Sequence, residues 1–301
     1  KNQVFDMPKA KQVLKKVRKL DIKTKKLVDG LMQGAYISAF KGRGIEFCDV
    51  REYVPGDDIR SIDWNVTART DEPHVKEFIE ERDLTAIIVF DASASSDFGT
   101  QKSLKKEQGI EIAASIAMSA VKNNDKIGLL IATEGVEKFI APKKGLKYAF
   151  RIIRELIYCQ LKHKTTNIKT ALEFLINITK RKSIIFIISD FQFNLKDIEK
   201  PLSILNRKND VVCIKLDDLR DYDIPDVVMV EFEDEETGEC VLIDTKDPIF
   251  RENYKKMADE KQKNTNDFFM KKRIDIINIS TSKEWAHNLH NFFKQRRKKF
   301  R

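Results

Sequence analysis

The chain has little cysteine, and no two cysteines stand at a metal-binding spacing. Four cysteines occur in 301 residues, widely separated, at positions 48, 159, 213 and 240. Structural zinc sites use closely spaced pairs of Cys or His ligands, so this spacing argues against one. Free thiols are typical of a reducing compartment, and we therefore expect a cytoplasmic protein.

Long apolar runs are missing as well. No stretch approaches the roughly 20 apolar residues that a membrane-spanning helix needs. The first thirty residues are basic and amphipathic and lack the apolar segment of a secretory signal, so we expect no signal peptide. We therefore expect no transmembrane segment, while contact with a membrane surface stays open.

The common catalytic motifs are absent. The sequence contains no Gly-x-x-x-x-Gly-Lys phosphate loop and no Gly-x-Ser-x-Gly nucleophile motif, and its four histidines fit no triad arrangement. Ser93 occupies the place where an aspartyl phosphatase would carry its second carboxylate. We therefore expect a protein that is not an enzyme, and a metal-dependent hydrolase is kept as an alternative.

Positive charge is concentrated at the two ends of the sequence. Residues 1–30 hold ten Lys or Arg against three Asp, and residues 291–301 hold six without any acid. The formal net charge is +9, so the part between is mildly acidic. Basic ends can bind nucleic acid or an anionic membrane, which gives a second alternative function. Nucleic acid is the less favoured partner, because no aromatic residues alternate with the basic ones to stack on bases.

The hydrophobic pattern changes twice along the chain. Apolar residues at three- and four-residue spacing predict an amphipathic helix within residues 1–33. Residues 34–83 are richer in Gly and Pro and predict a small β-rich module. From residue 84, strands and helices alternate, which is typical of a mostly parallel α/β sheet. We expect strands at about 84–90, 127–132, 135–140, 183–189, 210–216 and 274–280, and helices at about 104–123, 145–160, 168–180, 197–207, 250–272 and 283–297.

Polar residues follow the first of these apolar strands. Asp91, Ser93 and Ser95 come directly after the run at 85–90, which has the composition of a buried parallel strand. Open α/β sheets bind ligands at the carboxyl ends of their strands, so this carboxylate and these hydroxyls stand where a site is expected. Carboxylate and hydroxyl oxygens suit a hard cation such as Mg²⁺.

A second strand ends in the same way. Asp190 follows the run at 184–188, and Thr165-Thr166-Asn167 opens a helix between the two strands. Two carboxylates and a threonine at one sheet edge predict a metal-dependent recognition site. The alternative is that each aspartate caps a following helix, as Asp often does.

The same residues resemble a known family. Asp91, Ser93, Ser95, Thr166 and Asp190 match the five positions of the metal-ion-dependent adhesion site of von Willebrand factor type A domains. Upstream, the segments 40–47, 50–64 and 68–70 are similar to the bacterial family known as domain of unknown function 58, whose members accompany MoxR-type AAA+ ATPases. The hairpin residues 236–239 and the segment from Thr281 to Phe293 resemble it as well, so the likeness spans about residues 20–295.

This resemblance implies a fold and a role. The expected fold is a Rossmann-like von Willebrand A domain over residues 84–297, with a six-stranded sheet, helices on both faces and a basic tail at 298–301. The hairpin 227–245 is a candidate addition to the β-rich module. The five metal ligands would hold Mg²⁺, with Mn²⁺ or Ca²⁺ as alternatives. A client protein would offer an acidic side chain to the ion, and a MoxR-type ATPase would be the partner in folding, complex assembly or metal insertion.

The resemblance favours Thr166 because the family pattern places Thr just before Asn or Asp, and Thr165 remains an alternative.

Within the upstream module, residues 34–83, we expect Trp64 to be a packing anchor. Its dense set of charges is either an ion-pair network that ties the module to the A domain or a docking surface, and it consists of Glu46, Arg51, Glu52, Asp57, Asp58, Arg60 and Arg69.

Overall fold

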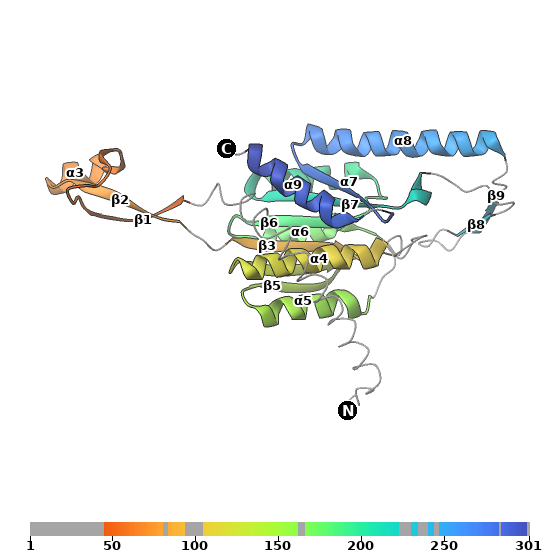
Figure 1. Ribbon diagram of the computed structural model, residues 1–301, viewed down its shortest axis with the longest axis horizontal. Helices are drawn as coiled ribbons and strands as arrows, with labels where there is room; N and C mark the ends of the chain where they lie inside the picture. The colour runs from red at the N-terminus through yellow and green to blue at the C-terminus, as the bar shows by residue number, and fades with distance from the viewer. Residues whose placement is uncertain are drawn as a thin grey trace, which may run out of the picture.

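A six-stranded sheet lies at the centre of the computed structural model, which describes residues 45–80, 84–93, 105–161, 166–222, 230–233, 240–243, 247–282 and 284–299 (Figure 1). The strand order is β10-β7-β6-β3-β4-β5, and every pair is parallel except β4 with β5 at one edge. The strands are β3 (Thr85–Asp91), β4 (Lys126–Ala132), β5 (Val136–Lys143), β6 (Ile184–Ser189), β7 (Asp210–Asp217) and β10 (Asp275–Ser280).

Helices cover both faces of this sheet. The first face packs against α4 (Lys105–Lys122), α5 (Leu146–Tyr158) and α9 (Trp285–Lys299). The second packs against α6 (Ile168–Ile178), α7 (Leu195–Lys208) and α8 (Pro248–Lys271). The predicted α/β fold class, with a mostly parallel six-stranded sheet between helices, is therefore confirmed. None of the helices in the described part of the chain has both the length and the apolar character needed to cross a bilayer.

The central strand β3 shows why these residues form a two-sided core. Ile88 and Phe90 contribute to the core under α4, while Ile87 and Val89 contribute to the core under α6 and α7. Successive side chains of a strand point to opposite faces, so a continuous apolar run is what a strand covered on both faces requires.

Helix α4 lies close to the sheet because its inner face is built from small residues. Ala113, Ala114 and Ala117 are completely buried. A Cβ atom at Gly109 would lie only 2.9 Å from Leu216 Cδ1 and 3.0 Å from Phe90 Cε2. The close approach brings the beginning of α4 to the carboxyl edge of β3 and β6, where the candidate site lies.

The order of the strands creates a topological switch point at this edge. From β3 the chain continues to β4 and β5 on one side and then returns to β6 on the other side of β3. Loops that leave neighbouring strands in opposite directions open a space at the carboxyl ends, which is where α/β sheets bind ligands. Asp91 ends β3 and Asp190 directly follows β6, so both reach this place.

The upstream module is a hairpin with two short helices. β1 (Ile45–Glu52) pairs antiparallel with β2 (His74–Glu80), and between them lie η3 (Ile59–Ser61) and α3 (Trp64–Thr70). The predicted β character is found in this part, and α3 was not foreseen. The predicted helix at residues 1–33 lies outside the described residues.

A second hairpin occurs where the sequence predicted one. β8 (Val230–Glu233) and β9 (Cys240–Ile243) pair antiparallel in a two-stranded sheet separate from that of β1 and β2. The turn at residues 236–239 lies outside the described residues, as does the end of the basic tail at residues 300 and 301.

Candidate metal site

Asp91 is buried at the end of β3, and hydrogen bonds orient both of its oxygens. The Ser93 backbone N–H donates to Asp91 Oδ1 at 3.1 Å, and the Ser189 hydroxyl donates to Asp91 Oδ2 at 2.6 Å. Ser189 is the last residue of the neighbouring strand β6. The carboxylate is therefore held in position by its own loop, through Ser93, and by the neighbouring strand, through Ser189.

Electrostatics make this carboxylate costly to ionise. Burial, together with the negative charge of Asp190, raises the pKa of Asp91 from 3.8 to about 6, although the bonds from Ser189 and Ser93 lower it in part. Asp91 accepts a hydrogen bond from Ser189, the residue before Asp190, so the two acidic residues lie at neighbouring strand ends. A divalent cation between them would remove both causes of the rise, because it would replace lost water and neutralise the repulsion.

A sharp turn after β6 places Asp190. The following residue, Phe191, has a positive φ of 53°, and its N–H donates to Ser189 Oγ at 2.9 Å. Asp190 Oδ1 accepts the Gln192 N–H at 3.2 Å. Helix α7 is capped by Asn194. The alternative that Asp190 is the cap of the following helix is therefore wrong, and its second oxygen faces other partners.

Thr166 comes to the same edge from a third loop. It is half-buried and stands just before α6, which begins at Ile168. The next residue, Asn167, donates its N–H to the Thr133 carbonyl at 2.9 Å. Thr133 follows Ala132, the register partner of Asp91 on β4. The loop that carries Thr166 is thus attached to the strand end beside Asp91.

The structure therefore brings four of the five predicted ligands to one edge of the sheet. Asp91, Ser93 and Asp190 are buried there, and Thr166 is half-buried. Ser95 and the alternative ligand Thr165 lie outside the described residues. The described residues contain no cluster of three or more His, Cys, Asp or Glu around a common point. The predicted set has two carboxylates and three hydroxyls, and its assignment as a metal site stays a prediction.

Lys105 is a site residue that sequence reasoning missed. It is the first residue of α4 and only 2% exposed. Its Nζ lies 3.4 Å from Asp190 Oδ2 and 2.9 Å from the Asp221 carboxylate. Burial alone would lower the pKa of this ammonium, but the charges of Asp190 and Asp221 outweigh burial, so the pKa is raised. Lys105 is therefore a charged lysine in the interior.

Asp221 is the second missed residue, at the end of η5 (Leu219–Asp221). Its Oδ2 accepts the Asp218 N–H at 2.7 Å, which fixes the carboxylate within the turn after β7. Burial raises its pKa, and the ammonium of Lys105 opposes that rise. Two carboxylates, those of Asp190 and Asp221, thus flank one ammonium. The charge of Asp190 also acts on Asp91, and the carboxylate and hydroxyl oxygens of the predicted set suit a divalent cation.

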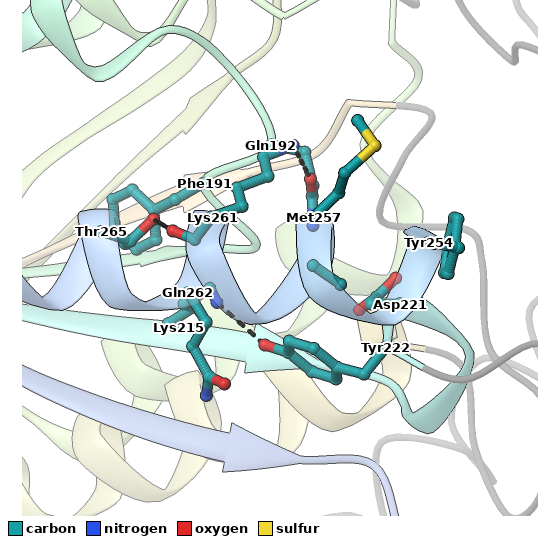
Figure 2. A pocket seen from close by; sticks show the side chains of 11 residues that line it. Phe191, Gln192, Lys215, Asp221, Tyr222, Tyr254, Met257, Lys261, Gln262 and Thr265 are labelled. Atoms are coloured by element: carbon teal, nitrogen blue, oxygen red, sulfur yellow. Dashed lines mark hydrogen bonds between the residues drawn. The ribbon is translucent and has the colours of Figure 1, made fainter. Parts of the chain in front are cut away.

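A cavity of about 260 Å³ borders this cluster between η5 and α8. Figure 2 shows Tyr222 and Lys215 beside α8, which contributes Tyr254, Met257 and Lys261. Lys215 Nζ lies 2.9 Å from Asp217 Oδ1 and donates to the Tyr222 hydroxyl at 3.0 Å. Lys215 and Asp221 are already in ion pairs and Lys261 donates to the Gln192 side chain, so the cavity does not by itself indicate a ligand of one chemical class.

The mixed charges of the upstream module form contacts within it. Arg51 binds Asp57 through two hydrogen bonds of 2.7 and 2.8 Å, and Lys76 lies 3.6 Å from Asp63. The expectation that Trp64 is a packing anchor is wrong, since the side chain is 68% exposed. It begins α3, whose cap Asp63 accepts the N–H groups of the next turn, and it faces solvent instead of a core.

The chain is similar in sequence to proteins whose function is unknown. The family model described as "Protein of unknown function DUF58" matches residues 49–264. The uncharacterized protein Rv1480 of Mycobacterium tuberculosis is 28% identical over 296 residues, which cover 98% of this chain and 92% of that protein.

Solved structures with a similar fold are more distant. The conserved hypothetical protein BatB from Bacteroides thetaiotaomicron matches with a TM-score of 0.45 and 11% identity, over 71% of this chain and 99% of that one. A von Willebrand factor type A protein from Catenulispora acidiphila matches with a TM-score of 0.36 and 13% identity, over 47% and 35%. At these scores the likeness concerns the fold and carries no argument about function.

Proposed function

The chain belongs to the DUF58 family of proteins of unknown function, and from this premise we propose that it is a non-enzymatic adaptor that binds partner proteins through a divalent cation. Asp91, Ser93, Ser95, Thr166 and Asp190 would hold the ion. Mg²⁺ is the expected cation, because carboxylate and hydroxyl oxygens are the ligands that it prefers. When bound, it supplies a positive charge that can accept a carboxylate from a client protein.

One observation carries the proposal. Two buried carboxylates, Asp91 and Asp190, stand at the switch point of the sheet, and burial with mutual repulsion raises the pKa of Asp91 to about 6. Buried charges are normally paired or bind a metal, because the interior solvates an uncompensated charge poorly, at a cost of several kcal/mol. Ser189 supports the arrangement by holding Asp91 from the neighbouring strand.

The partner is proposed from the resemblance of the upstream segments to proteins that accompany MoxR-type AAA+ ATPases. In this proposal the ATPase hydrolyses ATP, and the present chain couples it to a client during folding, assembly or metal insertion. The proposal assigns ATP hydrolysis to the ATPase and client binding to the present chain, whose site offers predicted metal ligands and positioning groups but no assigned nucleophile.

A binding experiment with purified proteins tests the proposal. The full chain is immobilised, and association with a MoxR-type ATPase from the same organism is measured in Mg²⁺, in EDTA and after Mg²⁺ is restored. We expect binding in Mg²⁺, its loss in EDTA and its return. Asp190→Asn should abolish binding, whereas the matched control Asp197→Asn, at an exposed carboxylate in the first turn of α7, should not. Equal binding with and without chelator would contradict the metal-dependent mechanism.

A further inference from the structure

Lys105 occupies an unusual position for a lysine beside a cation site. Its ammonium contacts Asp190, one of the proposed metal ligands, and Asp221, which is not one. The two distances are unequal, 3.4 Å to Asp190 Oδ2 and 2.9 Å to the Asp221 carboxylate. The lysine thus has a closer partner outside the proposed ligand set and a looser one within it.

The elements that carry these groups restrict how they can move. Lys105 begins a helix whose inner face packs tightly on the sheet, and Asp221 is fixed by the N–H of Asp218. Asp190 follows a strand and is held through Gln192. The backbone positions are therefore set, while the long lysine side chain can shift its ammonium between two carboxylates without a change of fold.

From this geometry we infer that Lys105 is an internal cation that competes with the metal for Asp190, and that Asp221 is the site that retains it when the metal binds. The inference rests on the proposed metal site and goes beyond it by assigning two residues that set its affinity. Without the metal, Lys105 neutralises part of the charge on Asp190. With the metal, the repulsion between two cations near one carboxylate drives the ammonium toward Asp221.

This arrangement predicts opposite effects from two substitutions. Lys105→Met removes the competing cation and should tighten Mg²⁺ binding by at least about tenfold, since a unit charge within a few ångströms of a buried site contributes several kcal/mol. Asp221→Asn removes the alternative partner and confines the ammonium to Asp190, so it should weaken Mg²⁺ binding by about three- to tenfold. If both residues had a purely structural role, each of the two substitutions would weaken Mg²⁺ binding.

The double variant separates competition from simple loss of charge. If Asp221 acts through Lys105, then Asp221→Asn should weaken binding much less in the Lys105→Met background than in the wild type. If Asp221 acts only as a distant negative charge, its effect should be the same in both backgrounds. Lys106→Met is the matched control, because this neighbour loses the same charge while its ammonium acts on the Cys159 thiol.

Isothermal titration of the full chain with Mg²⁺ and Mn²⁺ measures these affinities, and circular dichroism in EDTA verifies that each variant is folded. Lys105→Gln is the second variant if Lys105→Met does not fold, and it should tighten binding in the same direction. A further readout is the rise in unfolding temperature on adding Mg²⁺, which should be larger for the Lys105 variant than for the wild type.

The outcomes distinguish this inference from the proposed function. If the wild type binds the ions and Lys105→Met binds them equally or more weakly, competition by Lys105 is overturned and the metal site stands. If the wild type binds neither ion, both the inference and the metal-dependent mechanism fail. Tighter binding by Lys105→Met, weaker binding by Asp221→Asn and non-additivity in the double variant together support the inference.

Discussion

Two ion-pair clusters in this protein use similar chemistry in different surroundings. In the upstream module, Arg51 binds Asp57 in a two-point contact, with the arginine side chain 43% exposed. At the sheet edge, Lys105 contacts Asp190 and is only 2% exposed. The arginine contact is shorter and better aligned, yet solvent screens it. The buried lysine has a longer contact, but solvent screens it far less.

The comparison shows that burial, more than contact distance, decides what an ion pair contributes. Arg51 and a backbone bond from Val54 lower the pKa of Asp57 to about 2, which is a local effect at the surface. At the sheet edge, burial raises the pKa of both Asp91 and Asp221 despite their hydrogen bonds. The module therefore carries charges that fix a turn, whereas the sheet edge carries buried carboxylates of which two, Asp190 and Asp221, are compensated by the Lys105 ammonium.

The largest effect expected on stability comes from removing one partner of the buried cluster. Lys105→Met should lower the free energy of unfolding in EDTA by about 3–5 kcal/mol, because it leaves Asp190 and Asp221 uncompensated in the interior. Arg51→Met removes a better-aligned pair but should change stability little, since that pair is exposed. Urea denaturation followed by circular dichroism measures both, and equal losses would remove the distinction between the two clusters.

A somewhat smaller effect on the free energy of unfolding is expected from a change in pH. The pKa of Asp91 is about 6 in the folded protein and 3.8 in its ordinary state. The folded state therefore retains a proton that the unfolded chain releases, so stability falls as pH rises from about 4 to about 6. A shift of two units corresponds to a contribution of about 3 kcal/mol.

Denaturation curves between pH 4 and 7 in EDTA test this sign. Other carboxylates also titrate in this range, so the comparison is between the wild type and Asp91→Asn. The wild type should lose stability relative to the variant as pH rises, and the difference should level off above pH 6. Two parallel pH profiles would show that Asp91 is not held in an unfavourable ionised state.

The smallest effect on the free energy of unfolding is expected from a substitution in the upstream module. Trp64→Ala should lower the free energy of unfolding by less than about 1 kcal/mol, because the side chain is 68% exposed. Phe90→Ala is the matched control in the sheet core, at 1% exposure, and should cost about 3–5 kcal/mol. A comparable loss for the two variants would restore the interpretation of Trp64 as a packing anchor.

The strands and helices of the sheet domain could be predicted because their sequence pattern is local. The run at 86–90 is apolar at every position, which a strand covered on both faces requires, and β3 occupies Thr85–Asp91. The small residues of α4, among them Ala113, Ala114 and Ala117, likewise allow the helix to lie close to the sheet, and Gly109 shows how close it lies. Parallel pairing then brings Asp91 and Asp190 to one edge.

The rest of the site depends on contacts between distant segments. Lys105 is the first of two adjacent lysines at the start of α4 and has the sequence context of a surface residue, whereas its partners Asp190 and Asp221 lie 85 and 116 positions away. Ser189 was visible at the strand end, but its role depends on Asp91, 98 positions away. Trp64 was assigned wrongly because a tryptophan in a short module is buried only if another element covers it.

Titration of the full chain with Mg²⁺ is the measurement that tests the account most directly. The wild type should bind one ion, and the isosteric double variant Asp91→Asn with Asp190→Asn should lose at least about a hundredfold in affinity, because it removes both anionic ligands. Asp197→Asn should bind like the wild type. If the double variant binds Mg²⁺ as tightly as the wild type, the two carboxylates at this edge do not hold a metal.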